Sequence, residues 1–213
     1  MINAPSDSGG SDAYPMPAAR RNQQSTPPPS VTAAPPAKPA TTMLVGWIGK
    51  LFWLRVEGKG TFQCSIQLKR AFETVLDRGT KTLVVDLDRC PIMDSTFLGT
   101  LTYAASRVRK AGGGSLSVLN ANARNLQLLS DLGLDHLMEV DRAGVMWKEE
   151  REAARACLAA CSESTEATRE EQTRHLLQAH KTLSNICESN EGRFRDVIHF
   201  LEQELQAPPG GQA

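Results

Sequence analysis

Two hydroxyl side chains, Ser95 and Thr96, follow Asp94 at a point where the chain changes from strand to helix. The run at 82–87 is rich in leucine and valine, which is typical of a buried strand, and residues 96–109 have the apolar spacing of a helix. A helix start carries unpaired backbone N–H groups and the positive end of the helix dipole. A hydroxyl at that position therefore caps the helix or accepts a phosphate group, and the two alternatives lead to different functions.

A phosphate on Ser95 would act as a switch on binding. It would add about −1.5 to −2 charges beside Asp94, and the helix start would tolerate this charge, so the domain would stay folded. A partner surface fitted to a neutral serine would meet like charge, at a cost of several kcal/mol. In the alternative interpretation Ser95 is only a helix cap, worth about 1 kcal/mol. Thr96 is the second candidate acceptor, and Asp94 is expected to cap or orient the loop.

The other residues of reactive type form no recognisable site. His175 and His180 lie five positions apart, which does not place a metal-ligand pair on one helical face. Cys157 and Cys161 are helical neighbours, but no second ligand pair accompanies them at zinc spacing. The glycine run at 112–114 lacks the Lys-Ser/Thr of a phosphate loop. We therefore predict no catalytic residue, metal site or cofactor, and no enzymatic activity.

The elements around the hydroxyl pair alternate between strand and helix. Strands are expected at 45–48, 51–56, 82–87, 116–119 and 137–140, and helices at 64–76, 96–109 and 122–132. This order, β-β-α-β-α-β-α-β, predicts an α/β fold in which a mixed sheet is packed by helices. We place this domain at residues 43–143.

The two ends of the chain differ from this central domain. Residues 1–42 are rich in proline, serine and alanine, which predicts a disordered tail. Residues 144–213 show helical periodicity only, with a break expected at 189–192, where Asn190 would cap a new helix. The last helix carries an apolar stripe, made of Phe194, Val197, Ile198, Leu201 and Leu205. The stripe must pack on the chain's own helices and sheet, or pair with a second copy or another partner, and both alternatives stay open.

Composition narrows the function classes. The chain has 213 residues and a formal net charge of zero, and no cluster of lysine and arginine follows one face, so we expect no nucleic-acid binding. No stretch of ~20 apolar residues exists, so no membrane span is expected. No secretory signal is visible at the N-terminus, and five cysteines without tight pairing fit a reducing cytoplasm.

The motif Asp94-Ser95-Thr96-Phe97-Leu98-Gly99-Thr100-Leu101 resembles the signature of STAS domains, as found in bacterial anti-sigma factor antagonists. The signature is Asp-Ser-(Ser/Thr)-Gly-Leu-Gly-x-Leu after a strand rich in valine and leucine. Phe97 stands where the family usually has its first glycine, and Gly99 occupies the second. The resemblance implies a STAS-like mixed sheet over roughly residues 43–142.

The resemblance also implies a function in signalling and transcription regulation. A serine kinase that doubles as an anti-sigma factor would bind Asp94, Ser95, Thr96, Phe97, Leu98 and Gly99. Phosphorylation of Ser95 would end that binding, and a phosphatase would reset it. The alternative is a constitutive STAS subunit of a lipid-transport or stress-sensing complex, assembled through the C-terminal helices.

Overall fold

The computed structural model of the chain describes residues 41–162 and 166–206. The strands are β1 (Thr42–Ile48), β2 (Leu51–Glu57), β3 (Thr82–Arg89), β4 (Ser115–Leu119), β5 (Glu139–Val140) and β6 (Ala159–Ala160). The helices are α1 (Phe62–Asp77), α2 (Ser95–Lys110), α3 (Ala123–Asp131), α4 (Lys148–Cys157), α5 (Arg169–Ser184) and α6 (Glu188–Gln206), with a 3-10 turn at Leu134–His136. The tail predicted at 1–42 lies outside the described residues, apart from its last two.

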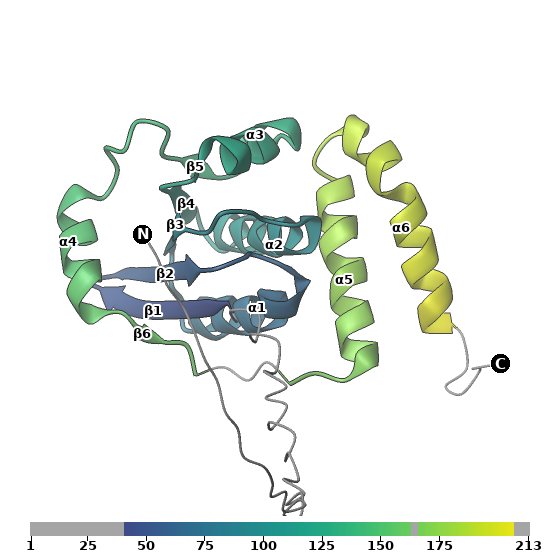
Figure 1. The fold of residues 1–213 in the computed structure, drawn as a ribbon, viewed down its shortest axis with the longest axis horizontal. Coiled ribbons are helices and arrows are strands. Elements are labelled where there is room, and N and C mark those ends of the chain that lie inside the picture. Colours follow the sequence, from purple (N-terminus) through teal and green to yellow (C-terminus); the bar gives the residue numbers. More distant parts are fainter. Residues whose placement is uncertain (1–40, 163–165, 207–213) are drawn as a thin grey trace, which may run out of the picture. The chain divides into compact units, whose positions relative to one another are not determined.

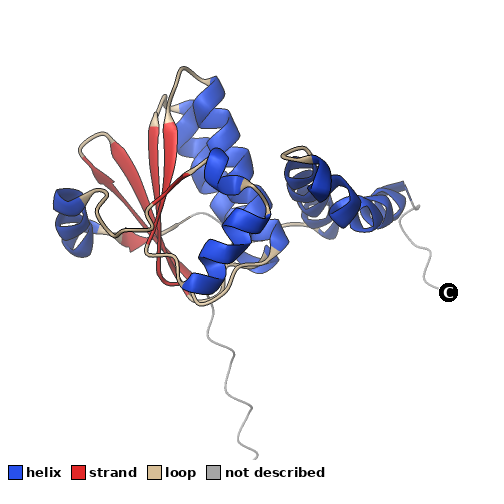
Figure 2. Cartoon of the chain, turned by 90° about the horizontal axis from the view of Figure 1, so that it is seen from above, coloured by secondary structure: helices blue, strands red, loops and turns tan. Residues whose placement is uncertain are grey.

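One mixed sheet organises the domain, with the strand order β5-β4-β3-β2-β1-β6. The strands from β2 to β5 are parallel to their neighbours, whereas β1 runs antiparallel to both β2 and β6. Figure 1 shows the helices on the sheet, and Figure 2 shows α4 on the opposite side of the sheet from α1, α2 and α3. The predicted mixed α/β fold is confirmed.

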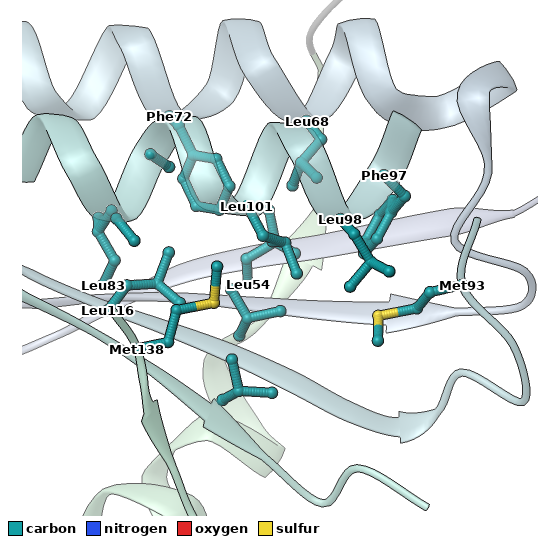
Figure 3. Close-up of a cluster of buried hydrophobic side chains, with 14 of the residues drawn as sticks. Leu54, Leu68, Phe72, Leu83, Met93, Phe97, Leu98, Leu101, Leu116 and Met138 are labelled. Atoms are coloured by element: carbon teal, nitrogen blue, oxygen red, sulfur yellow. The ribbon is translucent and has the colours of Figure 1, made fainter. Parts of the chain in front are cut away.

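Strand β3 shows why the sheet is covered on both faces. Leu83 and Val85 point into the large core beneath α1 and α2, whereas Val84 points into a smaller cluster beneath α4. All three side chains are fully buried, because successive side chains of a strand alternate between the two faces. Figure 3 shows the large core, where Phe72 and Leu101 from the helices meet Leu83 and other strand residues.

The predicted helical extension after residue 143 is observed as α4, α5 and α6, and it also contains a short strand that was not expected. Strand β6 pairs with β1 through Ala159 and Ala160, opposite Val45 and Leu44. Two alanines have no period-2 pattern of their own, so periodicity does not predict this strand. The strand forms because the outer edge of β1 presents unpaired backbone N–H and C=O groups, with which Ala159 and Ala160 pair.

Helices α5 and α6 form an antiparallel hairpin, to which we refer below as the C-terminal hairpin (169–206). Thr168 and Glu171 form a capping box at its start. The break lies at 185–187, earlier than expected, so Asn190 is an internal residue of α6 and not its cap. Its side chain instead donates to the backbone carbonyls of Leu132 and Leu183.

Candidate functional site

Asp94 fixes the start of two helices at once. It is the N-cap of α2, where one carboxylate oxygen accepts the backbone N–H of Phe97 at 2.8 Å. The other oxygen accepts the N–H of Phe62, the first residue of α1, also at 2.8 Å. The backbone N–H of Asp94 donates to the carbonyl of Gly60. The predicted capping role of Asp94 is confirmed, and the loop before α2 is held from three directions.

Ser95 is the first residue of α2 and lies outside the cap position. Its Oγ is 2.9 Å from Nε2 of His180 in α5. The other ring nitrogen of His180, Nδ1, lies 2.8 Å from the carbonyl oxygen of Leu176, which can only accept. In a neutral imidazole Nδ1 therefore carries the proton, and Nε2 accepts the hydroxyl proton of Ser95. Ser95 is partly exposed, whereas the His180 side chain is buried.

The next three residues of the motif belong to the core. Thr96 is 4 % exposed, and Phe97 and Leu98 are buried in the cluster beneath α1 and α2 (Figure 3). The Phe97 ring lies against Gly60, where an added Cβ would sit 3.0 Å from the ring. The bulky residue at the usual glycine position is thus accommodated because position 60 has no side chain.

Gly99 allows α5 to approach α2 closely. A Cβ on Gly99 would lie 2.7 Å from the carbonyl carbon of Ala179 and nearer still to its oxygen. Real Cβ atoms do not approach backbone this closely, so only glycine permits this helix crossing. Because Ala179 precedes His180, the same crossing brings His180 to Ser95, one turn earlier on α2.

A second histidine contacts α2 next to this crossing. Nε2 of His175 lies 3.2 Å from Oγ1 of Thr100, whose own proton goes to the carbonyl of Thr96 at 2.8 Å. The His175 ring therefore donates to Thr100, and its Nδ1 is buried without a partner. Burial in an apolar contact, assisted by the positive charge of Lys69, lowers the pKa of His175 from 6.5 to about 4.

A shallow hollow of about 250 Å³ lies between α1 and α5, beside this contact. Its lining mixes basic and acidic side chains with His175: Ile66, Lys69, Arg70, Glu73, Glu171, Arg174, His175 and Gln178. Ser95 is not among them, so the hollow offers no substrate site for the Ser95–His180 pair. Within residues 41–162 and 166–206, no three His, Cys, Asp or Glu side chains gather where they could hold a metal ion.

The sequence interpretation treated both histidines as ordinary surface or core residues, and so it did not connect them with the motif. The signal that bears on them is their spacing around Ala179: His175 lies one turn before it on α5, and His180 directly follows it. The facing row on α2 has one hydroxyl, one glycine and one further hydroxyl at Ser95, Gly99 and Thr100. Such a small and polar row favours a close helix crossing, but it does not reveal which helix crosses it.

Comparisons with known proteins agree with the motif. Residues 47–139 match the family described as "Mlab, STAS domain", a segment that falls within the predicted domain at 43–143. No curated protein matches the chain. No helix in the described part of the chain is long and apolar enough to cross a bilayer.

Several solved structures are similar to this chain in part. A putative anti-sigma factor antagonist from Thermotoga maritima is 18% identical, with a TM-score of 0.45, and covers 52% of this chain and 92% of its own. The unphosphorylated anti-sigma factor antagonist SpoIIAA is 16% identical, with a TM-score of 0.43 and coverages of 54% and 98%. An anti-sigma factor antagonist from Mycobacterium paratuberculosis is 19% identical, with a TM-score of 0.45 and coverages of 55% and 95%.

Proposed function

We propose that this chain is a regulator of the anti-sigma factor antagonist type, switched by phosphorylation of Ser95; the match of residues 47–139 to the STAS family supports this proposal. The observation that carries the proposal is the position of Ser95. It is the first residue of α2, directly after the N-cap Asp94, and its side chain is partly exposed at the edge of the contact with α5. A phosphate there adds charge beside that contact and not within the hydrophobic core.

Ser95 is a better phosphorylation site than the neighbouring Thr96. Thr96 is 4 % exposed and points into the packed domain, so a kinase would have to unfold the start of α2 to reach it. The positive end of the α2 dipole partly offsets the charge of a phosphate on Ser95. We therefore assign the switch to Ser95, with Thr96 as the weaker alternative.

The partner in this proposal is a serine kinase that is also an anti-sigma factor. It binds the neutral form through the surface around Asp94–Leu101, and a phosphatase restores that form after phosphorylation. The chain acts in the cytoplasm and contributes no catalytic residue. The negative charge of phosphoserine beside Asp94 opposes rebinding, since like charges facing each other across an interface cost several kcal/mol.

The decisive measurement is the intact mass and the phosphopeptide map of the protein purified from its own cells, before and after phosphatase treatment. We expect a phosphate-sized mass increment on the peptide containing Ser95, removed by the phosphatase and absent from the Ser95→Ala variant. An unmodified loop across growth and stress conditions would contradict the proposal.

A second candidate is a constitutive STAS subunit of a lipid-transport or stress-sensing complex. The bond between Ser95 and His180 favours it, because this hydroxyl already has a structural partner within the chain. Neighbouring genes separate the two candidates cheaply. Genes for a kinase and a phosphatase support the switch, whereas genes for a transporter permease and its ATPase support the subunit.

A further inference from the structure

The C-terminal hairpin covers the face of α2 on which the proposed switch lies. Figure 1 shows α5 running along the ends of α1 and α2, with α6 on its outer side. His180 accepts the Ser95 hydroxyl at 2.9 Å, and Ala179 closes over Gly99 one turn further along. The face of α2 that carries Ser95, Gly99 and Thr100 therefore already has an occupant, and it is a segment of the same chain.

A phosphate on Ser95 conflicts with this cover when the serine keeps its present side-chain orientation. Its phosphorus atom and outer oxygens would then extend from Oγ toward the His180 ring, whose Nε2 is only 2.9 Å away. The ring is held in place by its bond to the Leu176 carbonyl and by packing against Phe194, 5.6 Å away between ring centroids. The backbones of α2 and α5 are already in contact at Gly99 and Ala179, so the contact has no slack there. In that orientation, room for the phosphate requires α5 to move away.

The two helices of the hairpin are joined to each other by ion pairs, between Arg169 and Glu204 at 2.9 Å and between Lys181 and Glu202 at 2.5 Å. The hairpin meets the sheet domain through apolar packing: Leu183 and Phe194 are buried in the large core, and Ile186, Val197 and Ile198 pack against it. Hydrogen bonds across the contact come from side chains, among them His180 with Ser95, Asn190 with the carbonyl of Leu132, and Lys69 with Gln178 at 2.7 Å.

We propose that the C-terminal hairpin is a displaceable intramolecular cover of Ser95, and that docking of the hairpin and phosphorylation of Ser95 exclude each other. This inference rests on the proposed function of Ser95. The docked hairpin shields the serine from a kinase and occupies the α2 face that a partner would bind. Phosphoserine holds the hairpin away, because its phosphate takes the place of the His180 ring.

Hydrogen–deuterium exchange on the full-length protein tests the proposal. The wild-type protein is compared with protein that carries phosphoserine at position 95, incorporated during synthesis. We expect amide exchange across 169–206 to accelerate at least tenfold in the phosphorylated protein, since an isolated helical pair is marginally stable. Exchange in β3 and β4 should not change. Equal protection of the hairpin in both proteins would overturn the proposal.

A matched pair of glycine variants tests the cover without adding any charge. Gly99→Ala places a methyl group against the Ala179 backbone, while alanine itself favours the α2 helix. Gly192→Ala makes the same change in α6, where a Cβ meets nothing within 4 Å. We expect Gly99→Ala to accelerate exchange across 169–206 and Gly192→Ala to leave it unchanged. A hairpin that stays protected in Gly99→Ala would contradict close docking as the basis of the cover.

The two proposals fail in different ways. If phosphoserine releases the hairpin but Ser95 is unmodified in cells, the cover is supported and the phosphorylation switch is not. If Ser95 is phosphorylated in cells but the hairpin stays protected, the switch acts on the partner directly and the cover is overturned.

Discussion

Helices α4 and α5 both pack against the sheet domain from the C-terminal part of the chain, but they are attached by different chemistry. Helix α4 is attached through buried charges, whereas α5 is attached through two histidines that contact hydroxyl groups. Figure 2 shows the two helices on opposite sides of the domain. The first kind of contact favours permanent attachment, and the second favours an attachment that a change at Ser95 can break.

The contact of α4 is a continuous network of charged and amide groups. Asp86, 2 % exposed, accepts from Arg55 at 2.9 Å and from Asn120 at 2.7 Å. Arg151 of α4 then donates to both Asn120 and Asp141. Every charge in this network has a partner, so removing one of them would leave a buried charge without compensation.

Asp141 shows how thoroughly this network is satisfied. Burial by itself would raise the pKa of its carboxyl group. The backbone N–H groups of Val145 and Met146, together with Arg151, outweigh that effect and hold the pKa below its usual range. The carboxylate therefore stays charged at neutral pH and keeps α4 in place.

The contact of α5 has the opposite property. Within residues 41–162 and 166–206, neither His175 nor His180 forms an ion pair, and no described group bonds to the buried Nδ1 atom of His175. The contact depends on the close approach of the two helices at Gly99 and on the hydrogen bonds of both rings. The comparison of the two helices suggests a rule for displaceable elements. Their contacts must be specific in geometry, but separating them must not leave a buried charge without its partner.

The largest expected effect breaks the α4 contact. Arg151→Met should lower the free energy of unfolding by about 3 kcal/mol, because Asp141 is left buried without its arginine. Urea denaturation measures the change. Arg155→Met is the control: its pair with Glu152 is 70 % and 77 % exposed, and its loss should barely change the stability. Equal effects of the two substitutions would show that the network is not a special attachment.

The second-largest effect is a pH dependence of the stability that comes from His175 in the α5 contact. The pKa of His175 is lower in the folded protein than in the unfolded chain. The contribution of this histidine to the free energy of unfolding is therefore fully present above pH 6.5. It is lost as the pH falls toward 4, because the unfolded chain then binds a proton that the folded protein does not. Between pH 7 and 4.5 the loss should amount to about 2 to 3 kcal/mol. The difference in stability between the wild type and His175→Gln, followed by urea denaturation at each pH, should show this dependence.

His199→Gln provides the control for that measurement. His199 is exposed on α6, and its Nε2 lies 2.9 Å from the side-chain amide nitrogen of Gln203. Its replacement should leave the pH dependence of stability as in the wild type. A wild-type curve that parallels His175→Gln across the whole range would contradict the role given to His175.

The smallest effect concerns the turn of the C-terminal hairpin. Asn190→Ala should lower the free energy of unfolding by about 1 to 2 kcal/mol, because the carbonyls of Leu132 and Leu183 lose their donor in a buried place. Gln203→Ala, on the exposed side of α6, should cost only a few tenths of a kcal/mol. Similar values for both variants would show that Asn190 does not hold the hairpin to the domain.

Much of the fold could be predicted because its elements have clear periodicity. The helix at 96–109 was expected and is observed as α2, Ser95–Lys110, and the strand at 82–87 is observed as β3, Thr82–Arg89. Strand β6 could not be predicted, since only the neighbouring edge of β1 makes those two alanines a strand. The start of α6 was misplaced because Asn190 has the type of a capping residue, while its side chain serves a tertiary contact.

The helix start at Asp94 and Ser95 was predicted, but the elements that surround it were not. Asp94 as a cap follows from the general preference for aspartate before a helix, and the structure confirms it. The apolar stripe of the last helix was expected to need a cover, and Phe194 and Leu201 are buried within the chain itself. Whether α6 also meets a second copy stays a prediction.

The sequence by itself determined the order of the strands and helices from β1 to β5, the place of the hydroxyl at a helix start, and which faces must be buried. Only the tertiary structure decided that His180, 85 positions away, lies against Ser95, and that Phe97 fits because Gly60 has no side chain. The physical reason is that periodicity depends on neighbours along the chain, whereas the partner of a buried face depends on how whole elements pack.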